Sequence, residues 1–181
     1  MKKVVSVGLI LLISAIAIQS FIPVTPVTDG YYKSQQRFWA TTRSHTLEVA
    51  EAMPADKYNY QPTDTIRSFG AQMAHIAYST RFLVDNFVMG KQVKFEDPDA
   101  SKLSKAQIIK MLNDSFDKIG ESMKKISDEQ LNEMVEFPPG SGRKLTKADF
   151  FDFCRDHITN HRAKANLYIR MVGIKPPAYK F

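Results

Sequence analysis

The feature that most constrains the fold is an apolar repeat that follows Ser104. Large apolar residues recur there at intervals of three and four: Ile108, Leu112, Phe116, Ile119, Met123 and Ile126. This spacing places one apolar stripe along a helix of 3.6 residues per turn. Ser104 and Gln107 have the spacing of a capping box, in which both side chains bond backbone amides at the start of a helix. The sequence therefore predicts an amphipathic helix that must bury one face against other elements.

Three further stretches show helical spacing of apolar residues and end at a glycine or a proline. Their expected ranges are residues 32–53, 68–90 and 146–172. A second capping pattern begins at Ser127 and predicts a short helix to about Met134, followed by a loop or small hairpin over residues 135–145. Four long amphipathic helices with few strand signals predict an all-α four-helix bundle. Residues 91–103 are long enough to cross this bundle rather than to form a tight hairpin.

The composition fits one folded domain and excludes several kinds of site. The chain has 181 residues and a formal net charge of +6, without a dense run of lysine and arginine among aromatic residues. Nucleic acid is therefore not an expected partner. The single cysteine, Cys154, excludes an internal disulfide and a thiolate-rich zinc site. We expect the folded domain to cover residues 32–181.

Residues 1–31 have the pattern of a targeting segment followed by a linker. Lys2 and Lys3 precede an uncharged apolar stretch over residues 4–18, which is shorter than the roughly 20 residues that a membrane-spanning helix needs. We therefore expect a signal peptide over residues 1–20 and an extended, proline-containing linker over residues 21–31. An uncleaved N-terminal membrane anchor stays open as the alternative. Either interpretation places the domain outside the cytoplasm, in the periplasm or the extracellular space.

Two of the four histidines, His157 and His161, lie four residues apart on the apolar stripe of the last predicted helix. Residues four apart on a helix are neighbours, so their imidazoles can bind one metal ion. His75 lies in the second predicted helix, and three histidines leave at least one position open, as in a catalytic metal site. Ordinary core histidines would give the same pattern. Because Ile158 occupies the place of the glutamate in H-E-x-x-H, peptide hydrolysis by that route is not expected.

Several neighbouring residues allow two interpretations each. His45 could supply a fourth ligand or could be a polar residue at the flank of its helix. Cys154 could lie near the metal or could be a small buried hydrophobe. Tyr78 could offer its phenol to a bound group or could pack in the core. Arg155 and Arg162 could attract an anionic substrate or could belong to solvated helix faces.

The chain resembles the DinB-like family of four-helix bundles over about residues 32–179. The resemblance rests on the order and spacing of four segments, namely residues 52–62, 66–77, 156–162 and 173–177. It implies an up-up-down-down bundle with a crossover after the second helix. It also implies a divalent metal, most often zinc or nickel, held by one histidine of the second helix and two of the fourth, which match His75, His157 and His161. Homodimers are common in the family, so the resemblance implies that this chain can form one.

The resemblance leaves the reaction open, because a shared fold does not determine function. Similar proteins include thiol-dependent transferases or isomerases, metal-dependent hydrolases and many proteins without a known reaction. We expect an exported protein that binds a divalent metal and hydrolyses a small molecule of unknown identity. The alternatives are a metal- or ligand-binding envelope protein without catalysis, a bundle whose histidines bind nothing, and a thiol-dependent transferase. The last is disfavoured because compartments outside the cytoplasm are oxidising.

Overall fold

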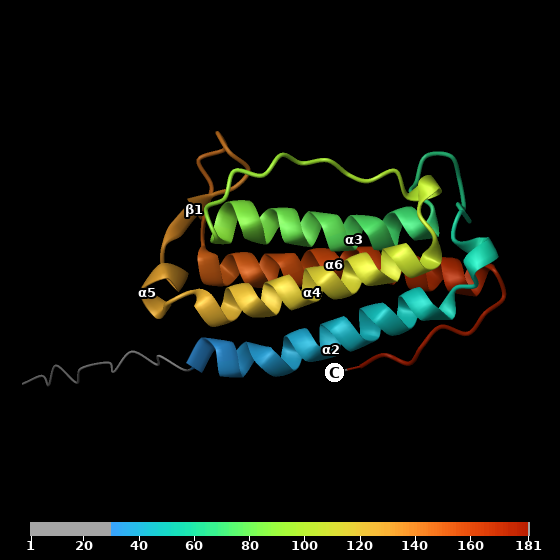
Figure 1. Ribbon diagram of the computed structural model, residues 1–181, viewed down its shortest axis with the longest axis horizontal. Coiled ribbons are helices and arrows are strands. Elements are labelled where there is room, and N and C mark those ends of the chain that lie inside the picture. Colours follow the sequence, from blue (N-terminus) through green and yellow to red (C-terminus); the bar gives the residue numbers. More distant parts are fainter. Residues whose placement is uncertain (1–29, 181) are drawn as a thin grey trace, which may run out of the picture.

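Four long helices lie side by side and make up most of the structure (Figure 1). The computed structural model describes residues 30–180, so the expected signal peptide and nearly all of the expected linker lie outside the described residues. The long helices are α2 (Gly30–Ala52), α3 (Phe69–Leu83), α4 (Lys105–Lys125) and α6 (Lys147–Met171). Within residues 30–180, no helix is long and apolar enough to cross a membrane.

Short elements connect the long helices. The connections contain the 3-10 turns η1 (Ala55–Lys57) and η3 (Ala100–Lys102), the π-helical turn η2 (Val84–Val88) and the short helix α5 (Asp128–Leu131). The expected hairpin is present as strands β1 (Met134–Glu136) and β2 (Lys144–Thr146), which pair antiparallel. The second predicted helix is divided in the structure, because α3 continues into η2 before the chain turns at Gly90, where φ is +66°.

Side-chain caps define where the helices begin. The side chain of Ser68 accepts a hydrogen bond from the backbone of α3, and complete capping boxes begin α4, α5 and α6 at Ser104, Ser127 and Thr146. At the other end of α6, Gly173 has a φ of +80°, a conformation that glycine adopts without strain. The structure therefore places these starts, and the end of α6, where the sequence predicted them.

The fold is the all-α four-helix bundle that the sequence predicted, with the crossover after the second long helix. The directions of the helices differ from the expected up-up-down-down order. The directions follow from contacts that show which ends of neighbouring helices lie together. These contacts join Glu51 to Lys105, Tyr32 to Lys124, Tyr31 to Ala148, and Gln72 to Tyr168. These contacts make α2 and α6 parallel to each other and antiparallel to α3 and α4, so the order is up-down-down-up.

The physical reason for this order is the first connection, which closes at one end of the bundle. The Tyr58 hydroxyl donates to the carbonyl of Ala50 at 2.6 Å, and the Tyr58 carbonyl accepts from Gly70 N–H at 2.7 Å. The end of α2 and the start of α3 are thereby held together, and α3 must run back along α2. An up-up-down-down bundle needs two long crossovers. This chain has one, over residues 89–104 (Figure 1).

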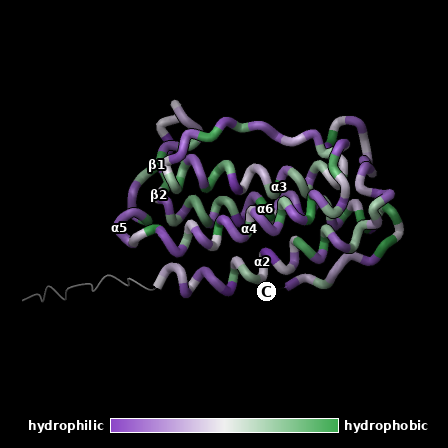
Figure 2. The backbone as a smooth tube through the Cα atoms, viewed as in Figure 1, coloured by the Kyte–Doolittle hydropathy of each residue, from purple (hydrophilic) through white to green (hydrophobic). Residues whose placement is uncertain are grey.

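The core is the common interior of the four helices. Apolar and polar stretches alternate along each long helix (Figure 2). The predicted stripe of α4 faces the core, since Ile108, Leu112 and Ile119 are almost fully buried. At one end, the ring of Phe150 packs against Phe87 and against other aromatic rings of the hairpin and α6. This packing fixes α6, which carries two of the three candidate ligands.

Candidate metal centre

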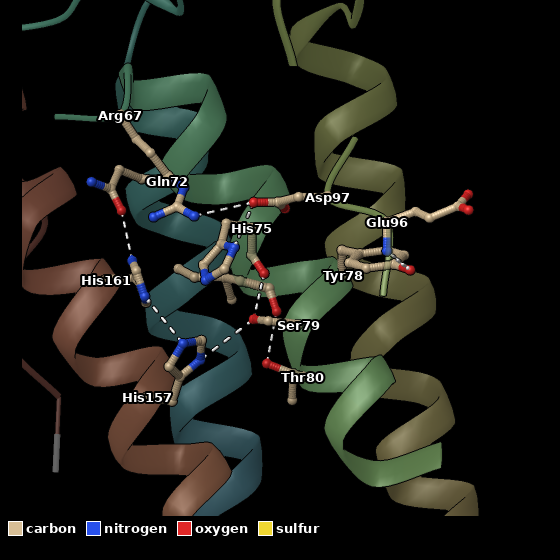
Figure 3. Close-up of polar contacts among 11 residues, drawn as sticks. Arg67, Gln72, His75, Tyr78, Ser79, Thr80, Glu96, Asp97, His157 and His161 are labelled. Carbon is tan, nitrogen blue, oxygen red and sulfur yellow. Dashed lines mark hydrogen bonds and ion pairs between the residues drawn. The ribbon is translucent and has the colours of Figure 1, made fainter. Parts of the chain in front are cut away.

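Three histidines meet between α3 and α6 (Figure 3). α3 carries His75, and α6 carries His157 and His161 one turn apart. The ring centroids of His157 and His161 are 4.5 Å apart, and the His75 centroid lies 5.3 Å and 4.6 Å from them, respectively. One nitrogen of each ring lies within 4.8 Å of the others, so the group could hold one metal ion. The fold thus brings together the three histidines that the sequence singled out.

His75 is oriented by a carboxylate from the crossover connection. Its Nδ1 lies 3.0 Å from Oδ2 of Asp97, and the same oxygen lies 3.2 Å from Nη2 of Arg67. A carboxylate can only accept, so Nδ1 of His75 carries the proton and Nε2 carries a lone pair. The connection is itself held in place by Tyr78, whose hydroxyl accepts from the backbone N–H of Glu96 at 2.5 Å.

The two histidines of α6 are oriented by polar side chains of α3. Nδ1 of His161 donates to Oε1 of Gln72 at 2.6 Å, while Nε2 of Gln72 donates to the Tyr168 hydroxyl at 3.3 Å. The Ser79 hydroxyl donates to a backbone carbonyl within α3, which leaves its oxygen to accept from Nδ1 of His157 at 3.4 Å. Partners of this kind on the outer nitrogen are typical of metal-binding histidines, since they fix the tautomer and the ring orientation.

The inner nitrogens are spaced as ligands of one ion. Nε2 of His157 lies 3.1 Å from Nε2 of His161. Two nitrogens that are each 2.0–2.1 Å from one tetrahedral ion lie about 3.3 Å apart. Two lone pairs at this distance need a cation between them, either a proton on one nitrogen or a metal ion bound by both. Nε2 of His75 makes no hydrogen bond within the described residues. Of the three histidines, His157 is half-buried, whereas His75 and His161 are buried.

Burial keeps the three imidazoles neutral. It is the main reason that the pKa of His157 is lowered to about 4 and that of His161 to about 3, with neighbouring imidazoles adding to the effect. Burial also lowers the pKa of His75, against the opposing effect of the Asp97 carboxylate. Neutral imidazole is the form that binds zinc, nickel, copper and iron. The residues therefore fit a divalent transition metal and do not fit a site for magnesium or calcium, which prefer oxygen ligands.

His45 and Cys154 are buried, and neither joins the three histidines. The ring of His45 packs edge-on against Tyr179 with centroids 5.6 Å apart, and its nitrogens are not part of the ligand group in the described chain. The expectation that His45 is a polar flank residue is also wrong, because only 2% of it is exposed. Cys154 is fully buried, which raises the pKa of its thiol, and it takes the place of a small hydrophobe.

The two candidate arginines of α6 face α2. Arg162 is buried and donates to Oγ1 of Thr46 at 3.3 Å. Arg155 donates to Oε1 of Gln35 at 2.8 Å and lies 3.2 Å from an Asp152 carboxylate oxygen. Both guanidinium groups therefore link helices, and neither contacts the three histidines. Neither of the two roles that the sequence left open, attracting an anionic substrate or occupying a solvated face, describes Arg162.

The residues that orient the histidines were not predicted from the sequence. Gln72 and Ser79 lie three residues before and four residues after His75 on α3, so their helical spacing could have indicated a shared face. Asp97 carries no such signal, because it belongs to a connection without regular secondary structure. Its place beside His75 is set by the path of the crossover over α3 (Figures 1 and 3).

Replacing Gln72 by alanine is expected to lower the affinity for zinc by about 10- to 100-fold, the usual effect of removing the partner of a metal-binding imidazole. The His161 ring loses the acceptor that holds its tautomer, while all three ligands are kept. Competition with a chromophoric chelator measures the change. Gln36→Ala, at an exposed position on α2, serves as the matched control. Equal affinities for the two variants would show that Gln72 does not support the site.

Comparisons with known proteins agree with the fold. The model of the DinB superfamily matches residues 39–165. An uncharacterized protein of Bacillus subtilis, YjoA, is 22% identical over 131 residues, which cover 72% of this chain and 84% of YjoA. The crystal structure of YjoA, described as a DinB-like protein, superposes with a TM-score of 0.62 at 21% identity and covers 78% of this chain and 94% of its own. The crystal structure of a DinB-like protein from Bacillus cereus superposes with a TM-score of 0.68 at 14% identity. The match covers 82% of this chain and 97% of the Bacillus cereus protein.

Proposed function

Because the chain belongs to the DinB superfamily, we propose that it binds one divalent metal ion through His75, His157 and His161 and uses it to hydrolyse a small molecule. One observation carries this proposal. Three neutral imidazoles converge, each has a partner on its outer nitrogen, and the inner nitrogen of His75 has no hydrogen-bond partner within the described residues. A structural site would have its coordination completed by protein ligands, whereas three histidines leave a position for substrate or water.

Zinc or nickel fits this donor set best, since both bind imidazole readily and neither needs thiolate ligands. When bound, such an ion supplies Lewis acidity, which polarises a carbonyl or phosphoryl oxygen and lowers the pKa of water toward about 7. The chain orients the three imidazoles and keeps them neutral. Asp97 and Gln72 keep a proton on Nδ1 of His75 and His161, respectively. The lone pair of each ring is therefore on Nε2, the nitrogen that would bind the metal. The Phe153 ring stacks on His157 with centroids 6.4 Å apart.

The proposed setting is outside the cytoplasm. Its support is the basic start and the uncharged apolar stretch of residues 4–18. In an oxidising compartment a small thiol cosubstrate is scarce, which favours hydrolysis over thiol transfer. We also propose that the chain can form a homodimer, which rests on the family resemblance alone.

An activity screen tests the hydrolase proposal. The chain, purified without a histidine tag and loaded with zinc or nickel, is assayed on p-nitrophenyl esters, p-nitroanilides and p-nitrophenyl phosphates. We expect hydrolysis of at least one class that disappears with a chelator and returns when the metal is restored. If metal binds in stoichiometric amount and all three classes stay intact, the hydrolase proposal is contradicted for them and a binding role replaces it. Turnover only after a small thiol and an electrophile are added would instead support the transferase.

A further inference from the structure

Lys164 adds an uncompensated positive charge next to the three histidines. It follows His161 by three residues on α6, so His157, His161 and Lys164 share one face of the helix. Its side chain is exposed, and it forms no ion pair within residues 30–180. An exposed ammonium group therefore lies on the same face of α6 as two of the three histidines.

Arg67 provides a second positive charge on the α3 side. It directly precedes the cap of that helix, and its guanidinium lies next to His75 (Figure 3). Nη2 of Arg67 lies 3.2 Å from Oδ2 of Asp97, the oxygen that also accepts from His75. Within the described chain, Asp97 is the one carboxylate that contacts any of the three histidines. One negative charge thus faces two positive charges, and a bound divalent ion adds to the excess.

Aromatic rings line the same surroundings. Phe95 in the crossover connection is 43% exposed, and its ring lies edge-on to His75 with centroids 6.4 Å apart. Phe153 stacks on His157 from one turn earlier on α6. A ligand that reaches the histidines can therefore place an apolar part against these rings. Small-molecule sites commonly combine apolar walls with a few charged groups that fix orientation.

We infer that the ligand of the metal centre is an oxyanion, a carboxylate or a phosphate ester, and that Lys164 is the main residue that selects its charge. Arg67 supports this selection, but its charge is largely shared with Asp97. Lys164 acts as a positioning and specificity residue, since it attracts the anionic group to the site and is not itself a metal ligand. The inference rests on the proposed metal binding and adds the substrate class to it.

Cobalt(II) is the probe for the test, because its visible absorption reports changes in its ligands. The chain is loaded with cobalt and titrated with benzoate, with benzamide as its neutral analogue, and with inorganic phosphate. We expect benzoate and phosphate to shift the spectrum at lower concentrations than benzamide. Lys164→Met is expected to lower the affinity for both anions by about three- to tenfold, as for the loss of one partly screened charge. Lys164→Arg is expected to keep their affinity.

Arg170→Met is the matched control. It removes one positive charge from the same helix at an exposed position that faces away from the histidines, and it should leave anion binding unchanged. The inference is overturned if the anions bind no better than benzamide, or if Lys164→Met and Arg170→Met behave alike while cobalt stays bound. A larger loss for benzoate than for phosphate in Lys164→Met assigns a carboxylate, and the reverse assigns a phosphate. If the unaltered chain binds no cobalt, the metal centre itself fails, and this inference fails with it.

Discussion

Replacing His161 by alanine abolishes stoichiometric binding of zinc or nickel and leaves the bundle folded. His161 supplies one of three donors, and its Nε2 lies 3.1 Å from that of His157. Loss of a supporting partner already costs about 10- to 100-fold in affinity, so loss of a ligand should cost more. The metal content of the gel-filtered protein and competition with a chelator measure the effect, and far-ultraviolet circular dichroism checks the fold.

His45→Ala is the matched control for this experiment. His45 is buried, like His161, but lies outside the ligand group of the described chain. We expect this variant to lose stability, because it leaves a cavity, and to keep its metal. If His161→Ala retained metal at the level of the unaltered chain, or if both variants lost it equally, the assignment of ligands would be wrong.

Replacing Phe150 by alanine lowers the free energy of unfolding by about 3–5 kcal/mol, a large part of the roughly 5–15 kcal/mol that stabilises most domains. The Phe150 side chain is fully buried, and its ring centroid lies 5.1 Å from those of Phe87 and Phe137. The remaining cavity would separate the start of α6 from η2 and from the segment after β1. Urea unfolding of the metal-free protein measures the loss.

Phe38→Ala provides the comparison at an exposed phenylalanine. The Phe38 side chain is 52% exposed, and its ring is covered in part by the Arg155 guanidinium. Its loss should cost less than about 1 kcal/mol, the scale of one exposed cation–π contact. Similar losses for Phe38→Ala and Phe150→Ala would contradict the packing described for this end of the bundle.

The sequence predicted the helices well because each helix carries its own signals. The apolar repeat of α4 fixes which face is buried, and the caps at Ser104 and Thr146 fix where two helices begin. Helix direction carries no such local signal. It depends on which end of the bundle a connection closes, and here the contacts of Tyr58 with both α2 and α3 decide it. The expected up-up-down-down order was wrong for this reason.

Only part of the candidate site could be predicted from the sequence. His157 and His161 share a face by spacing, and His75 was singled out by its place in the second predicted helix before the family resemblance matched all three positions. Asp97 approaches His75 from 22 residues away, through an irregular connection that carries no periodicity. The burial of Arg162 was not expected either, because a lone arginine on an amphipathic helix usually stays in solvent. Such placements depend on packing between helices, which single-helix patterns do not encode.

The central claim is that His75, His157 and His161 bind one metal ion. Its most direct test is the zinc and nickel content of the chain, purified without a histidine tag, and of the variant with all three histidines replaced by alanine. We expect one ion per chain in the unaltered protein and none in the triple variant, with circular dichroism showing a helical fold in both. A metal-free unaltered chain under zinc and nickel supplementation, or equal metal content in the two proteins, would contradict it.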